Sequence, residues 1–83
     1  MSPNLLLNRH LGEVINTNRK AATISQAVLA ERAGVTRRFI QELENGRSDV
    51  SLQTLFRLAL ALGVSLTEIS RQIEEVMRSG YHE

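Results

Sequence analysis

Apolar residues recur at helical spacing along almost the whole chain, and residues with helix-capping properties separate the repeats. Ser25, Thr36 and Ser51 can each accept hydrogen bonds from the free N–H groups of a first helical turn. Gly34 and Gly63 suit the positive φ that often ends a helix. The pattern predicts an all-α fold with five helices, at roughly residues 4–21, 26–33, 37–45, 52–62 and 66–78.

The second and third predicted helices are short and are joined by a tight turn at Gly34. The inward face of the third helix is apolar, whereas its outward side carries Arg37, Arg38, Gln41 and Glu42. Arginine can donate two hydrogen bonds to guanine, glutamine can pair with adenine, and a carboxylate can accept from cytosine. This side is therefore either a surface that reads base edges or an ordinary solvated helix face.

Several features in one register resemble the helix-turn-helix of the lambda-repressor-like family, also called Cro/CI or XRE. They are Gln26 at the start of the second helix, the small residue Ala30, Gly34 in the turn, and the string Ile40-Gln-Glu-Leu-Glu-Asn-Gly46. The resemblance covers residues 7–69. It implies a compact five-helix domain that binds specific sequences of double-stranded DNA and regulates transcription, with the helix-turn-helix formed by helices 2 and 3.

The resemblance also implies a role for each matching position. Base reading falls to Thr36, Arg37, Arg38, Gln41 and Glu42, and phosphate binding to Gln26, Asn45 and Arg47. Glu42 has the alternative of pairing with Arg38 four residues earlier. Phe39 either touches DNA or covers the edge of the core. Arg19 and Glu44 are expected to form a partly buried ion pair, the alternative being two exposed charges. Ala22-Thr23 stands where the family often has a glycine, which leaves that turn undefined.

The fifth helix is the expected site of self-association. Its apolar face and the residues leading into it are Val64, Leu66, Ile69, Ile73, Val76 and Met77. A small domain has little core to cover such a stripe, so we expect a twofold homodimer, unless the helix folds back on its own bundle. A helix-turn-helix dimer reads an inverted repeat. The domain is expected to span residues 1–83, with a core at 7–69, a dimerising segment at 66–83 and a frayed end after Gly80.

Composition narrows the location and the partners. Net charge is +1, but six basic and two acidic residues precede Phe39, whereas four basic and seven acidic residues follow from there onwards. A basic front half suits a phosphate-facing surface. The sequence has no cysteine, no apolar run approaching the roughly 20 residues of a membrane helix, and no signal-peptide pattern. A cytoplasmic protein that does not interact with membranes is expected.

Catalysis is not expected. The two histidines, His10 and His82, lie in no metal-ligand spacing, and the five glycines are interpreted as scattered at helix ends. Neither a metal nor a cofactor is therefore predicted. The favoured function is a stand-alone repressor or autoregulator. The alternatives are an antitoxin, whose partner is a toxin or another regulatory protein, and an adaptor that binds protein rather than DNA.

Overall fold

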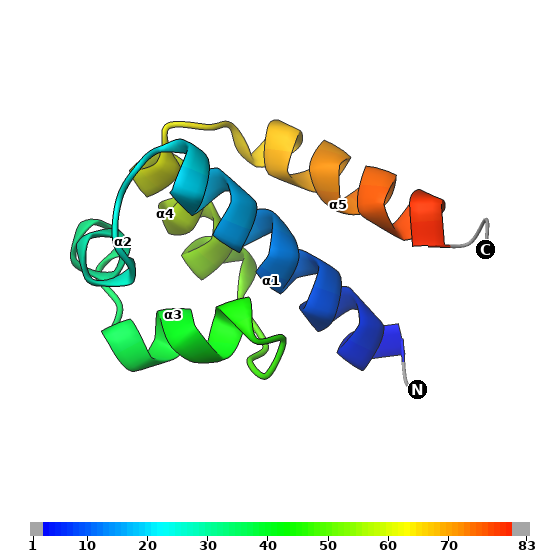
Figure 1. Ribbon diagram of the computed structural model, residues 1–83, viewed down its shortest axis with the longest axis horizontal. Coiled ribbons are helices and arrows are strands. Elements are labelled where there is room, and N and C mark those ends of the chain that lie inside the picture. The colour runs from blue at the N-terminus through cyan, green and yellow to red at the C-terminus, as the bar shows by residue number, and fades with distance from the viewer. Residues whose placement is uncertain (1–2, 81–83) are drawn as a thin grey trace.

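The structure is a computed structural model that describes residues 3–80, and this part of the chain forms five helices without a strand (Figure 1). The helices are α1 (Pro3–Ala21), α2 (Gln26–Ala33), α3 (Arg37–Glu44), α4 (Leu52–Leu62) and α5 (Leu66–Gly80). The predicted all-α, five-helix fold is confirmed. Helix α5 continues through Gly80 instead of ending near Arg78. The frayed end predicted for Tyr81, His82 and Glu83 lies outside the described residues.

The capping residues set the helix boundaries as the sequence predicted. Ser25, Thr36 and Ser51 each accept a hydrogen bond from the backbone N–H three residues later, at 3.0–3.1 Å. Gly34 and Gly63 end α2 and α4 with φ values of +71° and +76°, a conformation that glycine adopts without a Cβ clash. Local chemistry alone therefore fixes both ends of α2 and the start of α3.

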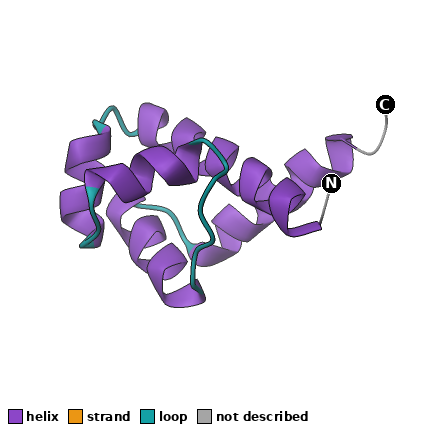
Figure 2. Cartoon of the chain, turned by 90° about the horizontal axis from the view of Figure 1, so that it is seen from below, coloured by secondary structure: helices purple, strands orange, loops and turns teal. Residues whose placement is uncertain are grey.

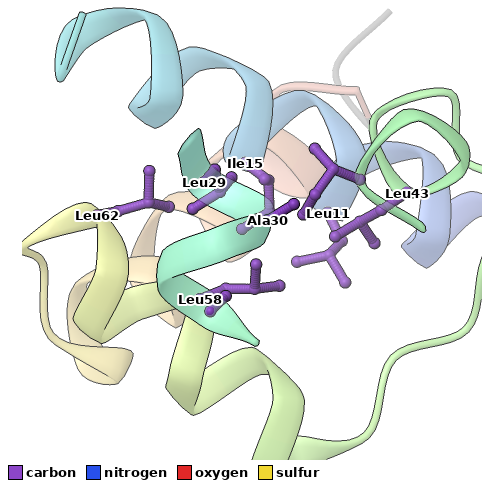
Figure 3. Close-up of a cluster of buried hydrophobic side chains, with 9 residues drawn as sticks. Leu11, Ile15, Leu29, Ala30, Leu43, Leu58 and Leu62 are labelled. Carbon is purple, nitrogen blue, oxygen red and sulfur yellow. The ribbon is translucent and has the colours of Figure 1, made fainter. Parts of the chain in front are cut away.

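The hydrophobic core joins α1, α2, α3 and α4 around small and branched side chains. Figure 3 shows residues from these four helices turned towards one another. The buried members of this cluster are Leu11, Ile15, Leu29, Ala30, Ala33, Ile40, Leu43, Leu58 and Leu62. A second cluster of Val14, Ala59 and Ile69 attaches α5 to the bundle. None of the buried members of the two clusters is aromatic.

Helix α1 runs through the middle of the molecule, with α3 packed on one side of it and α5 on the other (Figure 1). Helix α2 packs against α3 and α4, and short loops make the connections (Figure 2). The bundle measures 36 × 21 × 21 Å. Within residues 3–80 no single helix is long and apolar enough to cross a membrane; α4 and α5 reach that length only as a pair bent by 102°. The packing of α3 against α1 and α2 leaves the outer side of α3 at the surface.

The turn after α1 keeps the geometry of a glycine turn although no glycine is present. Thr23 has φ +56°, the only positive φ at a non-glycine among the described residues. Its N–H donates to Lys20 O at 3.0 Å, and the Ile24 N–H donates to Arg19 O at 3.4 Å. These are the paired bonds of a Schellman motif, which requires a left-handed residue at this position. A β-branched residue is strained there.

Candidate nucleic-acid interface

Helix α3 is held in the bundle by its own apolar side and by the turn before it. Ile40 and Leu43 have no exposed surface, and both belong to the main core cluster. Gly34 reverses the chain after α2, and Thr36 caps α3 through the Phe39 N–H. Phe39 is half-buried and packs against the core. These contacts fix which side of α3 faces outward.

The outward side carries the residues predicted to read bases. Thr36, Arg37, Arg38 and Gln41 are exposed, and Glu42 is half-buried. Within residues 3–80, the side chains of Arg37, Arg38 and Gln41 make no hydrogen bond or ion pair with the protein. The alternative pairing of Arg38 with Glu42 is not formed in the described structure. The structure thus presents two adjacent guanidinium groups in the first turn of α3 with their donors free.

The C-terminal end of α3 is attached to two other helices through the carboxylate of Glu44. Arg19 donates to it from Nε at 2.7 Å and from Nη2 at 3.1 Å. Asn16 Nδ2 donates at 2.8 Å and Gln26 Nε2 at 3.1 Å. The Arg19 and Glu44 side chains are 13% and 5% exposed. The expected Arg19–Glu44 ion pair is therefore present, and Glu44 joins the first three helices at one point.

The hydrogen bonds on Glu44 determine its charge state. Burial alone would raise the pKa of its carboxyl, but the donors from Arg19 and from two amide side chains outweigh it, so the pKa lies below its ordinary value. Glu44 is therefore ionised at neutral pH. A further bond from Arg19 Nη1 to Ile24 O, at 2.9 Å, extends the network to the strained turn after α1.

Two residues of this region were missed by sequence reasoning. Gly12 was expected at a helix end, but it lies inside α1 and is buried, where a Cβ would stand 2.4 Å from Leu43 O. Asn16 was given no role, although its amide bonds Glu44. Gly12, Asn16 and Arg19 share one face of α1, because they follow the i, i+4, i+7 spacing. That spacing is the signal from which the α1–α3 contact was predictable.

The residues predicted to bind phosphate lie at both ends of the helix-turn-helix. Gln26 opens α2 and is half-buried, with one amide N–H donated to Glu44. Asn45 and Arg47 are exposed just after α3. The loop that contains them is attached to α1, because Asn8 Nδ2 donates to Asp49 Oδ1 at 2.8 Å. Because only one N–H of the Gln26 amide is bonded to Glu44, its second N–H is left for another acceptor.

The apolar face of α5 is largely used inside the subunit. Ile69 is fully buried, so its assignment to a dimer interface is wrong; it is a core residue that attaches α5 to Val14 and Ala59. Val64, Ile73 and Val76 are half-buried and pack against the same clusters. Leu66 and Met77 are also half-buried. The alternative, in which the helix folds back on its own bundle, accounts for Ile69 and for much of this face.

Comparison with known families is consistent with this geometry. Residues 15–69 match the helix-turn-helix family, from the middle of α1 into α5. The chain belongs to the lambda-repressor-like helix-turn-helix family. This helix-turn-helix protein is 31% identical over 78 residues to the ImmF control region 10 kDa protein of Bacillus phage phi105. That match covers 93% of the chain and 87% of the phage protein.

Solved structures share the fold over most of their length. The clp gene regulator ClgR from Corynebacterium glutamicum has a TM-score of 0.86 at 28% identity, over 90% of this chain and 80% of that one. The restriction-modification controller protein C.AhdI from Aeromonas hydrophila has a TM-score of 0.73 at 31% identity, over 75% and 94% respectively. The helix-turn-helix protein therefore resembles regulators over its whole bundle and not only at the motif.

Proposed function

We propose that this protein is a sequence-specific, double-stranded DNA-binding transcriptional regulator, a repressor or autoregulator that acts in the cytoplasm as a homodimer on an inverted repeat. The observation that carries the proposal is the outward side of α3. Arg37, Arg38 and Gln41 are exposed there and unpaired within the described protein, on a helix whose other side is fixed in the core. The largely buried guanidinium of Arg19 is paired with Glu44, whereas Arg37 and Arg38 on the outward side of α3 are available to a partner.

The chemistry of the exposed groups matches the edges of base pairs. A guanidinium group donates two parallel hydrogen bonds to guanine O6 and N7, and a glutamine amide matches adenine N6 and N7. Arg37 and Arg38 lie in the first turn of α3, the part of a recognition helix that reaches deepest into the major groove. We infer a half-site that contains guanine. Thr36 and Glu42 border this surface and complete the reading set.

Phosphate contacts orient α3 in the groove. Gln26 lies at the N-terminus of α2, where free backbone N–H groups also favour an anion. We propose that its remaining amide N–H donates to a phosphate, while the bond to Glu44 holds the amide in place. Asn45 and Arg47, just after α3, contact the phosphate backbone of the DNA at the other end of the helix-turn-helix. These contacts supply affinity and register rather than sequence preference.

A single α3 of eight residues reads too few base pairs to select one site. In helix-turn-helix dimers two recognition helices enter successive major grooves about 34 Å apart, so the target is an inverted repeat. The names of similar proteins support this function: one is an ImmF control region protein of a phage, and another is a restriction-modification controller.

Selection of bound duplexes from a random pool tests the proposal, because it yields the half-site and the spacing together. At the selected site, Arg37→Ala and Arg38→Ala should each lose about 1–3 kcal/mol and relax base preference. Arg47→Ala should weaken binding to all sequences alike and flatten the salt dependence.

Arg71→Ala is the matched control. It removes the same charge from α5, where Arg71 is paired with Glu68 and Glu75, and it should leave binding unchanged. If the Arg37, Arg38 and Arg47 variants behave identically on selected and random DNA, the assignment of base readers is wrong. If the wild-type protein does not shift any duplex at low salt, DNA binding itself is wrong.

A further inference from the structure

An apolar stripe runs along the outer side of α4 and is not used by the core. Leu52, Phe56 and Leu60 are 70%, 50% and 65% exposed, and they follow one another at four-residue intervals on a single helix face. The opposite side of α4 is buried through Leu58 and Leu62. Exposed apolar residues scattered singly are normal, but an aligned row of large ones marks an interaction surface.

The order of residues in the stripe is the same in both directions, because a leucine stands four residues before and four residues after Phe56. A twofold axis requires a surface that complements itself, in which residue i contacts j and j contacts i. If two α4 helices cross antiparallel at Phe56, Leu52 of each copy faces Leu60 of the other. Like apolar groups then meet along the whole stripe.

The charges around the stripe permit a second copy to approach. Helix α4 contains no acidic residue and one basic residue, Arg57. The Arg57 guanidinium is drawn back along the helix, because Nη2 donates to Thr54 Oγ1 at 3.3 Å. Two copies therefore meet without an unpaired carboxylate in the interface. A basic partner has no complementary group on α4, and an acidic partner has only Arg57.

The size of the stripe suits the centre of a small interface. At about 150–200 Å² for a fully exposed large side chain, the three exposed fractions correspond to roughly 300 Å² of apolar surface per copy. A standard interface buries about 800 Å² per partner, with an apolar centre and a polar rim. The stripe can supply that centre, and exposed polar residues of α4 such as Gln53 can supply part of the rim.

We propose that the homodimer forms through α4, by antiparallel pairing of the stripe Leu52, Phe56 and Leu60 across a twofold axis at Phe56, and not through the apolar face of α5. The inference rests on the proposed dimeric function and names its interface. On α5 the apolar side chains are already half-buried or buried within the subunit, whereas the α4 stripe is not.

Charge substitution at the two ends of the stripe tests this pairing. Leu52→Glu places a carboxylate in the first turn of α4, and Leu60→Lys places an ammonium group in its last turn, both favourable to the helix dipole. Each single variant should therefore fold, as circular dichroism can verify. Each should raise the dimer dissociation constant at least tenfold in sedimentation velocity.

The double variant L52E/L60K gives the decisive measurement. Antiparallel pairing places residue 52 of one copy opposite residue 60 of the other, so the double variant should regain dimerisation relative to both singles. Met77→Glu on α5 is the control and should dimerise like the wild type. The proposal is overturned if the wild type stays monomeric up to about 200 µM, if M77E alone dissociates the dimer, or if the double variant is no better than the singles.

The outcome is separable from the test of DNA binding, because sedimentation needs no DNA. The single variants should also bind an isolated half-site as the wild type does, while losing the tighter binding to the complete inverted repeat. Failure of the wild type to bind any duplex would contradict the regulator function and leave the interface result standing.

Discussion

Replacement of Glu44 tests the part of the framework that holds the recognition helix. The carboxylate is 5% exposed and accepts from Arg19, Asn16 and Gln26. Glu44→Ala removes all of these bonds and leaves the Arg19 guanidinium, which is 13% exposed, without its counterion. Breaking a buried ion pair on one side costs about 3–5 kcal/mol, much of it from the charge that remains.

That cost is large for a domain of this size. At about 0.05–0.15 kcal/mol per residue, 83 residues correspond to a free energy of unfolding of roughly 4–12 kcal/mol. A change of 1 kcal/mol shifts Tm by about 4–8 °C in such a domain. We therefore expect Glu44→Ala to lower Tm by at least about 12 °C. DNA affinity should fall as well, because α3 and Gln26 lose a shared anchor.

The same bonds predict a pH dependence. Because the pKa of Glu44 is lowered in the folded protein, its contribution is complete above the unfolded pKa of about 4.3. The contribution is lost as the pH falls through the folded value. The difference in Tm between wild type and Glu44→Ala should therefore be full at pH 7 and shrink in acid.

Thermal denaturation followed by circular dichroism at several pH values measures both effects. Glu68→Ala is the matched control, because Glu68 pairs with Arg71 at the surface, where solvent screens the pair and little stability is lost. In the Arg19→Met/Glu44→Ala variant no buried charge remains, so part of the loss should be recovered. A Glu44→Ala protein that melts within about 3 °C of the wild type, or a difference independent of pH, would refute the reasoning.

Two further predictions concern the backbone. Gly12→Ala places a Cβ 2.4 Å from Leu43 O, so α1 and α3 must separate, at a cost of about 1–3 kcal/mol, and DNA affinity should fall. Gly63→Ala is its control, because a Cβ at residue 63 would meet no other atom but the backbone there has φ +76°. This variant should lower the Tm yet leave DNA affinity unchanged. Equal DNA affinities for both variants would contradict the close approach. Thr23→Gly relieves the φ of +56° and should stabilise the protein by about 1 kcal/mol. Thr17→Gly, an exposed change inside α1, should destabilise it; a lower Tm for Thr23→Gly would show that the turn is unstrained.

The helix boundaries were predictable because they depend on neighbouring residues. Thr36 accepts from an N–H three residues away, and Gly34 needs only its own φ, so both are readable from local sequence. The end of α5 was less so, since Ser79-Gly80 resembles a helix stop and yet both residues belong to α5.

The interior of the site depends on contacts between distant segments. Gly12 lies against residues more than thirty positions later, and only its spacing with Asn16 and Arg19 on one face of the first helix points to this contact. Ile69 lies on the apolar face of α5 whether that face forms a dimer or folds back on its own bundle. Only the packing against Val14 shows that Ile69 is buried within the subunit. The Arg19–Glu44 pair was reached through a family resemblance rather than through periodicity. The exposed residues of α3 were predictable because a helical face follows from spacing alone.

The way in which α3 is held has an evolutionary consequence. Its anchors are Ile40, Leu43 and Glu44, and none of the exposed groups at Arg37, Arg38 and Gln41 takes part in them. Exchange of the outer side chains therefore leaves the scaffold intact. A lineage built on this chain can acquire new operators by substituting a few surface positions, while its folding stability stays the same.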